Sequence, residues 1–314
     1  MYNQYDFNIK NSEKSTLKHL ASSFGFALLI SSAFQIIIAI IETMYMLLIK
    51  NNEIKFITKQ LFLAIESVML LLPIGFLTYK SYIPEKKYIL PFKKNSPKTT
   101  ILTTIFGLGV SFCAQIISAI VQNVIDAPSP QIDYKNSLFS ILVSIFSISI
   151  VPAVVEEITF RGVMLGSLRR YGDKFAIFMS ALLFGILHGN VSQSIFAFIL
   201  GITFGYMTIK TNSLLPSIIV HMLNNLLSVL IGSGILNSVI YFLLGVVITI
   251  QAIIISISLS IKDKNFLNID DTTICYLNSR EKIKAFFENS GIIIFMVLYL
   301  LIIVLNYTKT RLFI

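Results

Sequence analysis

The chain has 314 residues, of which 55% are hydrophobic and only 13% are charged. A soluble domain is usually about 25% charged, so this composition excludes an ordinary soluble protein. The net charge of +9 comes from Lys and Arg gathered in polar segments, which indicates membrane topology and contact with anionic lipid rather than nucleic-acid binding.

Long apolar runs predict an all-α, polytopic bundle of membrane-spanning helices. A helix needs about 20 apolar residues to cross a bilayer, and these runs do not alternate as the strands of an outer-membrane barrel would. The polar residues before the first run lack the features of a signal peptide and are expected to form a cytoplasmic tail. Nine spans are expected, at about 20–49, 60–79, 100–122, 138–168, 174–190, 193–210, 213–232, 234–261 and 289–308.

Lysine-rich polar segments set the expected orientation. The segment between the second and third spans contains Lys80, Lys86, Lys87, Lys93, Lys94 and Lys98. Cytoplasmic loops are enriched in Lys and Arg, so this segment and the N-terminus are expected inside and, with nine spans, the C-terminus outside. The loop with Asp126 and Asp133 then falls outside, and residues 262–288 form a cytoplasmic loop or surface helix. Lys50, Lys55 and Lys59 lie on the outer side, against the rule.

The fourth span contains an unusual charged motif, "VPAVVEEITFRG", with Glu156, Glu157 and Arg161. Ionisable groups at the centre of a membrane helix cost at least about 2.5–3.5 kcal/mol each, so they are candidates for function. The alternative is a helix end in water, but the sequence stays largely apolar to Leu168, which favours one helix. Glu157 and Arg161 are four residues apart and can form an ion pair, whereas Glu156 points elsewhere and is available for proton transfer.

Two histidines lie in later spans, His188 in "FGILHG" and His221 in "SIIVHMLNN". Either alone is typical of a hydrogen bond between helices. At about 1.5 Å per residue, however, Glu156, His188, His221 and Asn225 fall in one layer near the middle of the bilayer. A polar cavity enclosed by spans four to seven would satisfy all of them.

Two glycine pairs indicate where helices pack closely, whereas His19 and the two cysteines are not expected to form part of a site. The pairs Gly185–Gly189 and Gly201–Gly205 allow close approach of helices. His19 lies in the basic N-terminal region and is given no function. Cys113 and Cys275 are far apart in sequence and environment, so neither a disulfide nor a metal cluster is expected.

Three motifs in this order resemble the CPBP family of intramembrane proteases. "EEITFR" fits Glu-Glu-x-x-x-Arg, "FGILH" fits Phe-x-x-x-His and "HMLNN" fits His-x-x-x-Asn. The family comprises CAAX prenyl endopeptidases of the second type and bacteriocin-processing or immunity proteins, also called Abi proteins. The resemblance covers residues 138–232 and implies a four-helix catalytic core there, whereas the tail and three spans expected at 1–137 lie outside it. Two spans and a polar cytoplasmic loop would follow at 233–314.

The resemblance also implies roles for individual residues. Glu156 would activate water with the help of His188, and His221 and Asn225 would form an oxyanion hole. Three further residues would support the site: Glu157, Arg161 and Phe184. The expected reaction is hydrolysis of a peptide bond in a membrane-associated peptide or protein.

The same side chains raise the question of a metal cofactor. Glu156, His188 and His221 could supply the three ligands of a catalytic zinc. The helical zinc motif, however, places two imidazoles one turn apart, and here Asn225 follows His221 by one turn. An amide is a good hydrogen-bond donor, so catalysis without a cofactor is predicted, with zinc as the alternative.

Two other functions remain open from the sequence. The first is a bacteriocin-immunity or peptide-binding membrane protein that keeps the fold and needs no catalysis. The second is a transporter. Transporters typically have two matching halves with Gly- or Pro-broken helices, and the lack of such halves in this sequence counts against that function.

Overall fold

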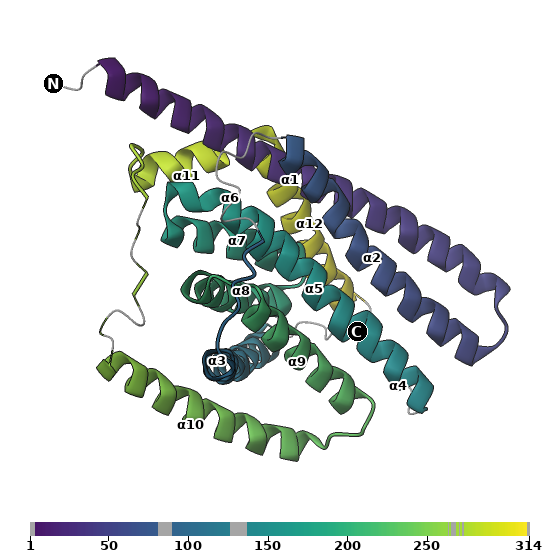
Figure 1. Cartoon of the computed structure of the whole chain (residues 1–314). Helices are drawn as coiled ribbons and strands as arrows, with labels where there is room; N and C mark the ends of the chain where they lie inside the picture. The colour runs from purple at the N-terminus through teal and green to yellow at the C-terminus, as the bar shows by residue number, and fades with distance from the viewer. Residues whose placement is uncertain are drawn as a thin grey trace.

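The computed structural model describes residues 4–80, 90–125, 137–262, 264, 268–269, 271 and 273–312. In that part of the chain the structure is helical (Figure 1), with an isolated β-bridge between Phe92 and Ser213. The expected all-α class is therefore confirmed. The loops expected at 81–89, with Lys86 and Lys87, and at 126–136, with Asp126 and Asp133, lie outside the described residues.

The helices are long and follow each other closely along the chain. Their bounds are α1 Gln4–Leu48, α2 Asn52–Lys80, α3 Pro97–Val124, α4 Leu138–Ser144, η2 Ile145–Ile150, α5 Val151–Glu157, η3 Ile158–Leu165, α6 Gly166–Leu168, η4 Arg169–Tyr171, α7 Asp173–Leu187, α8 Val191–Thr211, α9 Leu215–Gly232, α10 Ser238–Lys262, α11 Ser279–Phe287 and α12 Ser290–Leu312.

Seven helical stretches of the described chain are long and apolar enough to cross a membrane. The other two expected spans correspond to α2 and α7. Helix α7 has only 15 residues, fewer than the roughly 20 that a full crossing needs. The polytopic bundle is confirmed, and the number nine is approximate because α7 is this short.

The helices pack in layers on both sides of the stretch α4–η4 (Figure 1). The α1–α2 hairpin and α12 lie on one side, where α2 contacts α5 and α12 contacts α7. On the other side α8 and α9 are followed by α3, and α10 packs against α3 as the outer layer. The motif-bearing helices are thus the middle of the molecule.

Helix α1 begins at Gln4, well before the first span expected at residue 20. The helix continues because its early turns pack on α11, and Leu17 is fully buried there. Lys18 pairs with Glu288 at 2.9 Å, and this contact lowers the pKa of the Glu288 carboxyl. The expected surface helix within 262–288 is α11. The polar segment that was expected to form a tail is therefore helical and packs on α11.

The fourth span is one continuous helical stretch, Leu138–Tyr171, as the sequence predicts. Two sections of it, η2 and η3, are π-helical, which is a rare geometry that often occurs at functional sites. Pro152 at the start of α5 lacks the N–H that a regular turn would use, which accounts for an irregular turn before it. Glu156 and Glu157 lie between the two wide sections.

Close packing of α7 and α8 depends on glycine, as the small-residue pattern predicts. A Cβ at Gly201 would come 2.7 Å from Cβ of Ala181, and one at Gly185 would come 2.8 Å from the Ser194 carbonyl oxygen. Gly189 is different, since it adopts φ +63° in the turn after α7. The fifth span therefore ends at Leu187 rather than at 190, because the left-handed conformation of Gly189 terminates the helix.

Candidate active site

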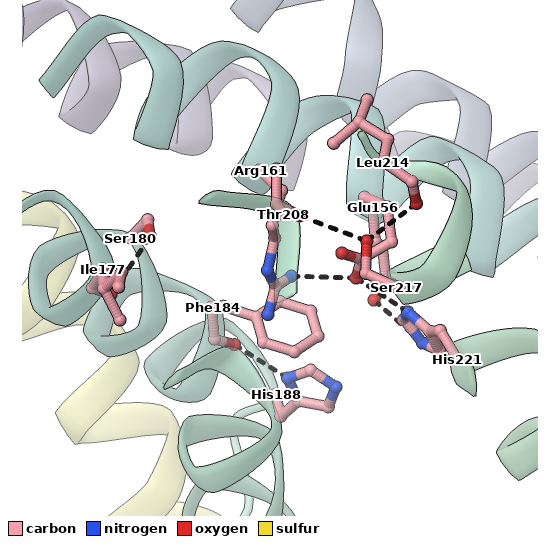
Figure 2. Close-up of polar contacts among 11 residues, drawn as sticks. Glu156, Arg161, Ile177, Ser180, Phe184, His188, Thr208, Leu214, Ser217 and His221 are labelled. Atoms are coloured by element: carbon pink, nitrogen blue, oxygen red, sulfur yellow. Dashed lines mark hydrogen bonds and ion pairs between the residues drawn. The ribbon is translucent and has the colours of Figure 1, made fainter. Parts of the chain in front are cut away.

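Four helical segments bring the motif residues together near the middle of the bundle. Glu156 and Glu157 end α5, Arg161 follows in η3, His188 caps the C-terminus of α7, and His221 lies on α9. Figure 2 shows Arg161, Phe184, His188 and His221 close to one another, with Glu156 beside His221.

The Glu157 carboxylate is the fixed centre of this cluster. Nη1 of Arg161 donates to its Oε1 at 3.0 Å, and both side chains have no exposed surface. The ion pair expected from the four-residue spacing is therefore present. Nδ1 of His221 lies 3.0 Å from the same oxygen, so Glu157 links the arginine to the histidine.

Aromatic rings enclose the guanidinium of Arg161. Its Cζ lies 4.3 Å from the ring centre of Phe184 and 5.3 Å from that of Phe204. The Phe204 ring also stacks on His221, with centroids 5.5 Å apart. Such contacts stabilise a cation where it is desolvated. Phe204 carried no sequence signal, because one phenylalanine in an apolar helix looks like any other.

Glu156 has a different environment from Glu157. Its side chain is 20% exposed, and its Oε2 lies 3.8 Å from Nε2 of His221. Together with His188 it lines a cavity of about 320 Å³. Glu156, which the helix geometry separates from Arg161, is thus the glutamate that lines the cavity, with His221 as its neighbour.

His188 is oriented by its own helix. Its Nδ1 lies 2.9 Å from the carbonyl oxygen of Phe184. A carbonyl can only accept, so Nδ1 carries the hydrogen and the lone pair of the neutral ring is on Nε2. The residue therefore contributes an acceptor to the cavity that it shares with Glu156.

Asn225 lies one turn after His221, and the structure gives it a partner of its own. Its Nδ2 donates to the carbonyl oxygen of Ile148 at 3.1 Å, and Ile148 lines the cavity with Glu156. A side-chain amide has two N–H hydrogens, so one remains for another acceptor.

The cavity also receives side chains from the first two helices, which the motifs do not include. Its polar lining consists of Gln35, Glu66, Ser67, Ser147, Glu156 and His188. Glu66 is a residue that the sequence analysis did not single out. Glu66 could have been identified from the sequence, because it is a carboxylate inside an apolar run.

A zinc site is not supported by the arrangement of possible ligands. Within the ranges that the structure describes, no three His, Cys, Asp or Glu side chains are grouped to hold a metal ion. In this arrangement Glu156, His188 and His221 are not grouped as a metal site, and both catalysis without a cofactor and the zinc alternative remain predictions.

Comparisons with known proteins agree with the motif pattern. Residues 138–227 match a family model described as type II CAAX prenyl endopeptidase Rce1-like. The chain is similar to "Putative membrane peptidase YdiL" of Bacillus subtilis (strain 168), with 24% identity over 138 residues. That match covers 42% of this chain and 57% of the relative, so the chain spans little more than half of it. No solved structure matches the chain.

These matches confirm the resemblance to the CPBP proteases that the three motifs indicate. The matched segment contains every motif residue from Glu156 to Asn225. At this level the chain resembles membrane endopeptidases of the CAAX type and is a multi-pass membrane protein.

Proposed function

We propose that this multi-pass membrane protein, whose residues 138–227 match the Rce1-like family model, is an intramembrane endopeptidase. It hydrolyses a peptide bond of a membrane-associated peptide or protein, with water as the nucleophile. The observation that carries this proposal is the shared cavity, which is lined by the carboxylate of Glu156 and the imidazole of His188.

The first step is activation of water by Glu156. The carboxylate takes one proton from a water molecule, and Nε2 of His188 accepts a hydrogen bond from the same water. The hydroxide oxygen then bonds to the carbonyl carbon of the substrate, which gives a tetrahedral oxyanion. General base catalysis of this kind contributes typically about 10²–10⁴-fold to the rate.

The second step is stabilisation of the oxyanion by His221 and Asn225. Nδ1 of His221 lies 3.0 Å from Glu157, so we assign the contact with the oxyanion to the N–H of Nε2 on the same ring. Asn225 supplies the amide hydrogen that Ile148 does not use. Each such donor contributes roughly 2.7–4 kcal/mol of transition-state stabilisation.

The third step releases the products. Glu156 returns its proton to the nitrogen of the leaving amine, the C–N bond breaks, and a carboxylic acid and an amine result. Every proton is accounted for within Glu156, water and the substrate. Glu157 and Arg161 take no part in these transfers and instead hold His221 in position.

The test is cleavage by the purified protein in liposomes of phosphatidylcholine and phosphatidylglycerol. A panel of fluorogenic membrane-associated peptides is compared between wild type and Glu156→Gln. Glu53→Gln, at an exposed position at the start of α2, is the matched control. Cleavage by wild type and Glu53→Gln but not by Glu156→Gln supports the proposal. Peptide binding without cleavage by any of the three would favour an immunity or binding protein instead.

A further inference from the structure

The candidate cavity contains a second carboxylate that the reaction does not use. Glu66 lies in the middle of α2, Asn52–Lys80, and lines the cavity together with Glu156 and His188. It comes from outside the segment that matches the family model, residues 138–227. The family match therefore does not account for Glu66, which reaches the cavity from α2.

Among the described side chains that line the cavity, none carries a counter-charge for the Glu66 carboxylate. In the described part of the chain, no hydrogen bond or ion pair to its carboxylate is found, although its main-chain oxygen accepts from Gln35 at 3.4 Å. The residues that line the cavity include two carboxylates and one imidazole, and no Lys or Arg is among them. A carboxylate at this depth is costly unless a partner neutralises it.

The shape of the cavity suits a long basic side chain as that partner. A volume of about 320 Å³ is at the lower end of the range of about 300–1,000 Å³ that is typical of ligand pockets. Leu63 and Leu70 of the same helix line it beside Glu66. Lys and Arg lay their methylene stems on apolar surface and direct their charge to a polar partner.

We propose that Glu66 is a specificity-determining residue, which binds a Lys or Arg side chain of the substrate close to the cleaved bond. The inference rests on the proposed endopeptidase function and names the substrate class of that same site. The preferred substrate is thus a membrane-associated peptide segment with a basic residue beside the bond that Glu156-activated water attacks.

The experiment varies the charge on both sides of this contact. The best-cleaved peptide of the liposome panel is prepared with Lys, Met or Glu at each of the two positions on either side of the cleaved bond. Ratios of kcat/KM between these peptides are measured for wild type, Glu66→Gln and Glu66→Lys. A ratio within one variant is insensitive to how much of that variant folds. Glu53→Gln is the matched control, because Glu53 is an exposed carboxylate at the start of the same helix α2 that does not line the cavity.

The expected result is a Lys-to-Met preference of about tenfold in wild type and in Glu53→Gln at one position of the peptide. The preference falls to about one in Glu66→Gln, and Glu66→Lys prefers the Glu peptide. Cleavage with equal ratios in wild type and Glu66→Gln would overturn the subsite and leave the endopeptidase function standing. Failure of wild type to cleave any peptide would overturn the function and the subsite with it.

Discussion

Nδ1 of His221 lies 3.0 Å from Oε1 of Glu157, the oxygen that also accepts from Nη1 of Arg161. One carboxylate oxygen thus links a buried cation on η3 to a histidine on α9. Any change that moves Glu157 therefore moves His221 as well. In the proposed mechanism, this relationship gives Glu157 a positioning role beside Glu156, the glutamate that lines the cavity.

Replacing Arg161 tests this link. Arg161→Ala leaves the fully buried Glu157 carboxylate without its cation, so the free energy of unfolding should fall by about 3–5 kcal/mol. Thermal unfolding in detergent measures the loss. Glu156→Gln, at a partly exposed side chain, should leave unfolding nearly unchanged. Equal unfolding temperatures for the two variants would contradict the separation of a positioning glutamate from a reacting one.

The contact between α7 and α8 has no room for another methyl group. A Cβ at Gly201 would lie 2.8 Å from Cα of Ala181 and 3.3 Å from Nη2 of Arg161. Gly201→Ala should therefore destabilise the protein by about 1–3 kcal/mol and reduce cleavage. Adding Ala181→Gly removes the Cβ that would lie 2.7 Å away but leaves the Cα at 2.8 Å, so the double variant should regain only part of both. If the double variant is no more stable or active than Gly201→Ala, close packing at this point is not the cause of the lost stability and cleavage.

Helix α12 should influence the reaction although it lies outside the matched segment. Nδ2 of Asn306 donates to the carbonyl oxygen of Gly189 at 3.0 Å, one residue after His188. Asn306→Leu removes that donor, so the turn that carries His188 should shift and kcat should fall about ten- to a hundredfold. KM should change little, because the cavity walls remain. Steady-state kinetics decide the matter, and a rise in KM at constant kcat would instead make α12 part of substrate binding.

The orientation inferred from the lysines can be checked by labelling in intact cells. In a background with Cys113→Ser and Cys275→Ser, a cysteine at position 132 should react with a membrane-impermeant thiol reagent. A cysteine at position 90 should not, because the lysine-rich segment beside it is expected in the cytoplasm. The opposite pattern would invert the topology and place the C-terminus inside.

Much of the site could be predicted from the sequence because its signals are local. The spacing of Glu157 and Arg161 predicts their ion pair, and charged residues in apolar runs stand out at once. The bond from His221 to Glu157 could not be predicted, since it joins residues on helices whose relative rotation depends on the whole bundle. The same holds for Glu66, which the motifs do not mark and which only the packing of α2 against α5 brings to the cavity.

Local geometry also limited the prediction of the fold. The expected ranges assumed regular helices, whereas η2 and η3 are π-helical and change the rotation per residue around Glu156. Helix α7 is shorter than its apolar run suggests, because Gly189 turns the chain. Helix α1 is longer, because its polar first turns pack on α11, a tertiary contact that no local pattern contains.

The most direct test of the proposed mechanism is the cleavage rate of Glu156→Gln in liposomes after exhaustive removal of metal ions. Wild-type protein, shown to be metal-free by elemental analysis, should still cleave the best peptide. The Glu156→Gln protein should cleave it about 10²–10⁴-fold more slowly while it inserts and unfolds like wild type. A Glu156→Gln rate equal to that of wild type, or wild-type activity that is lost on chelation and restored by zinc alone, would contradict the account.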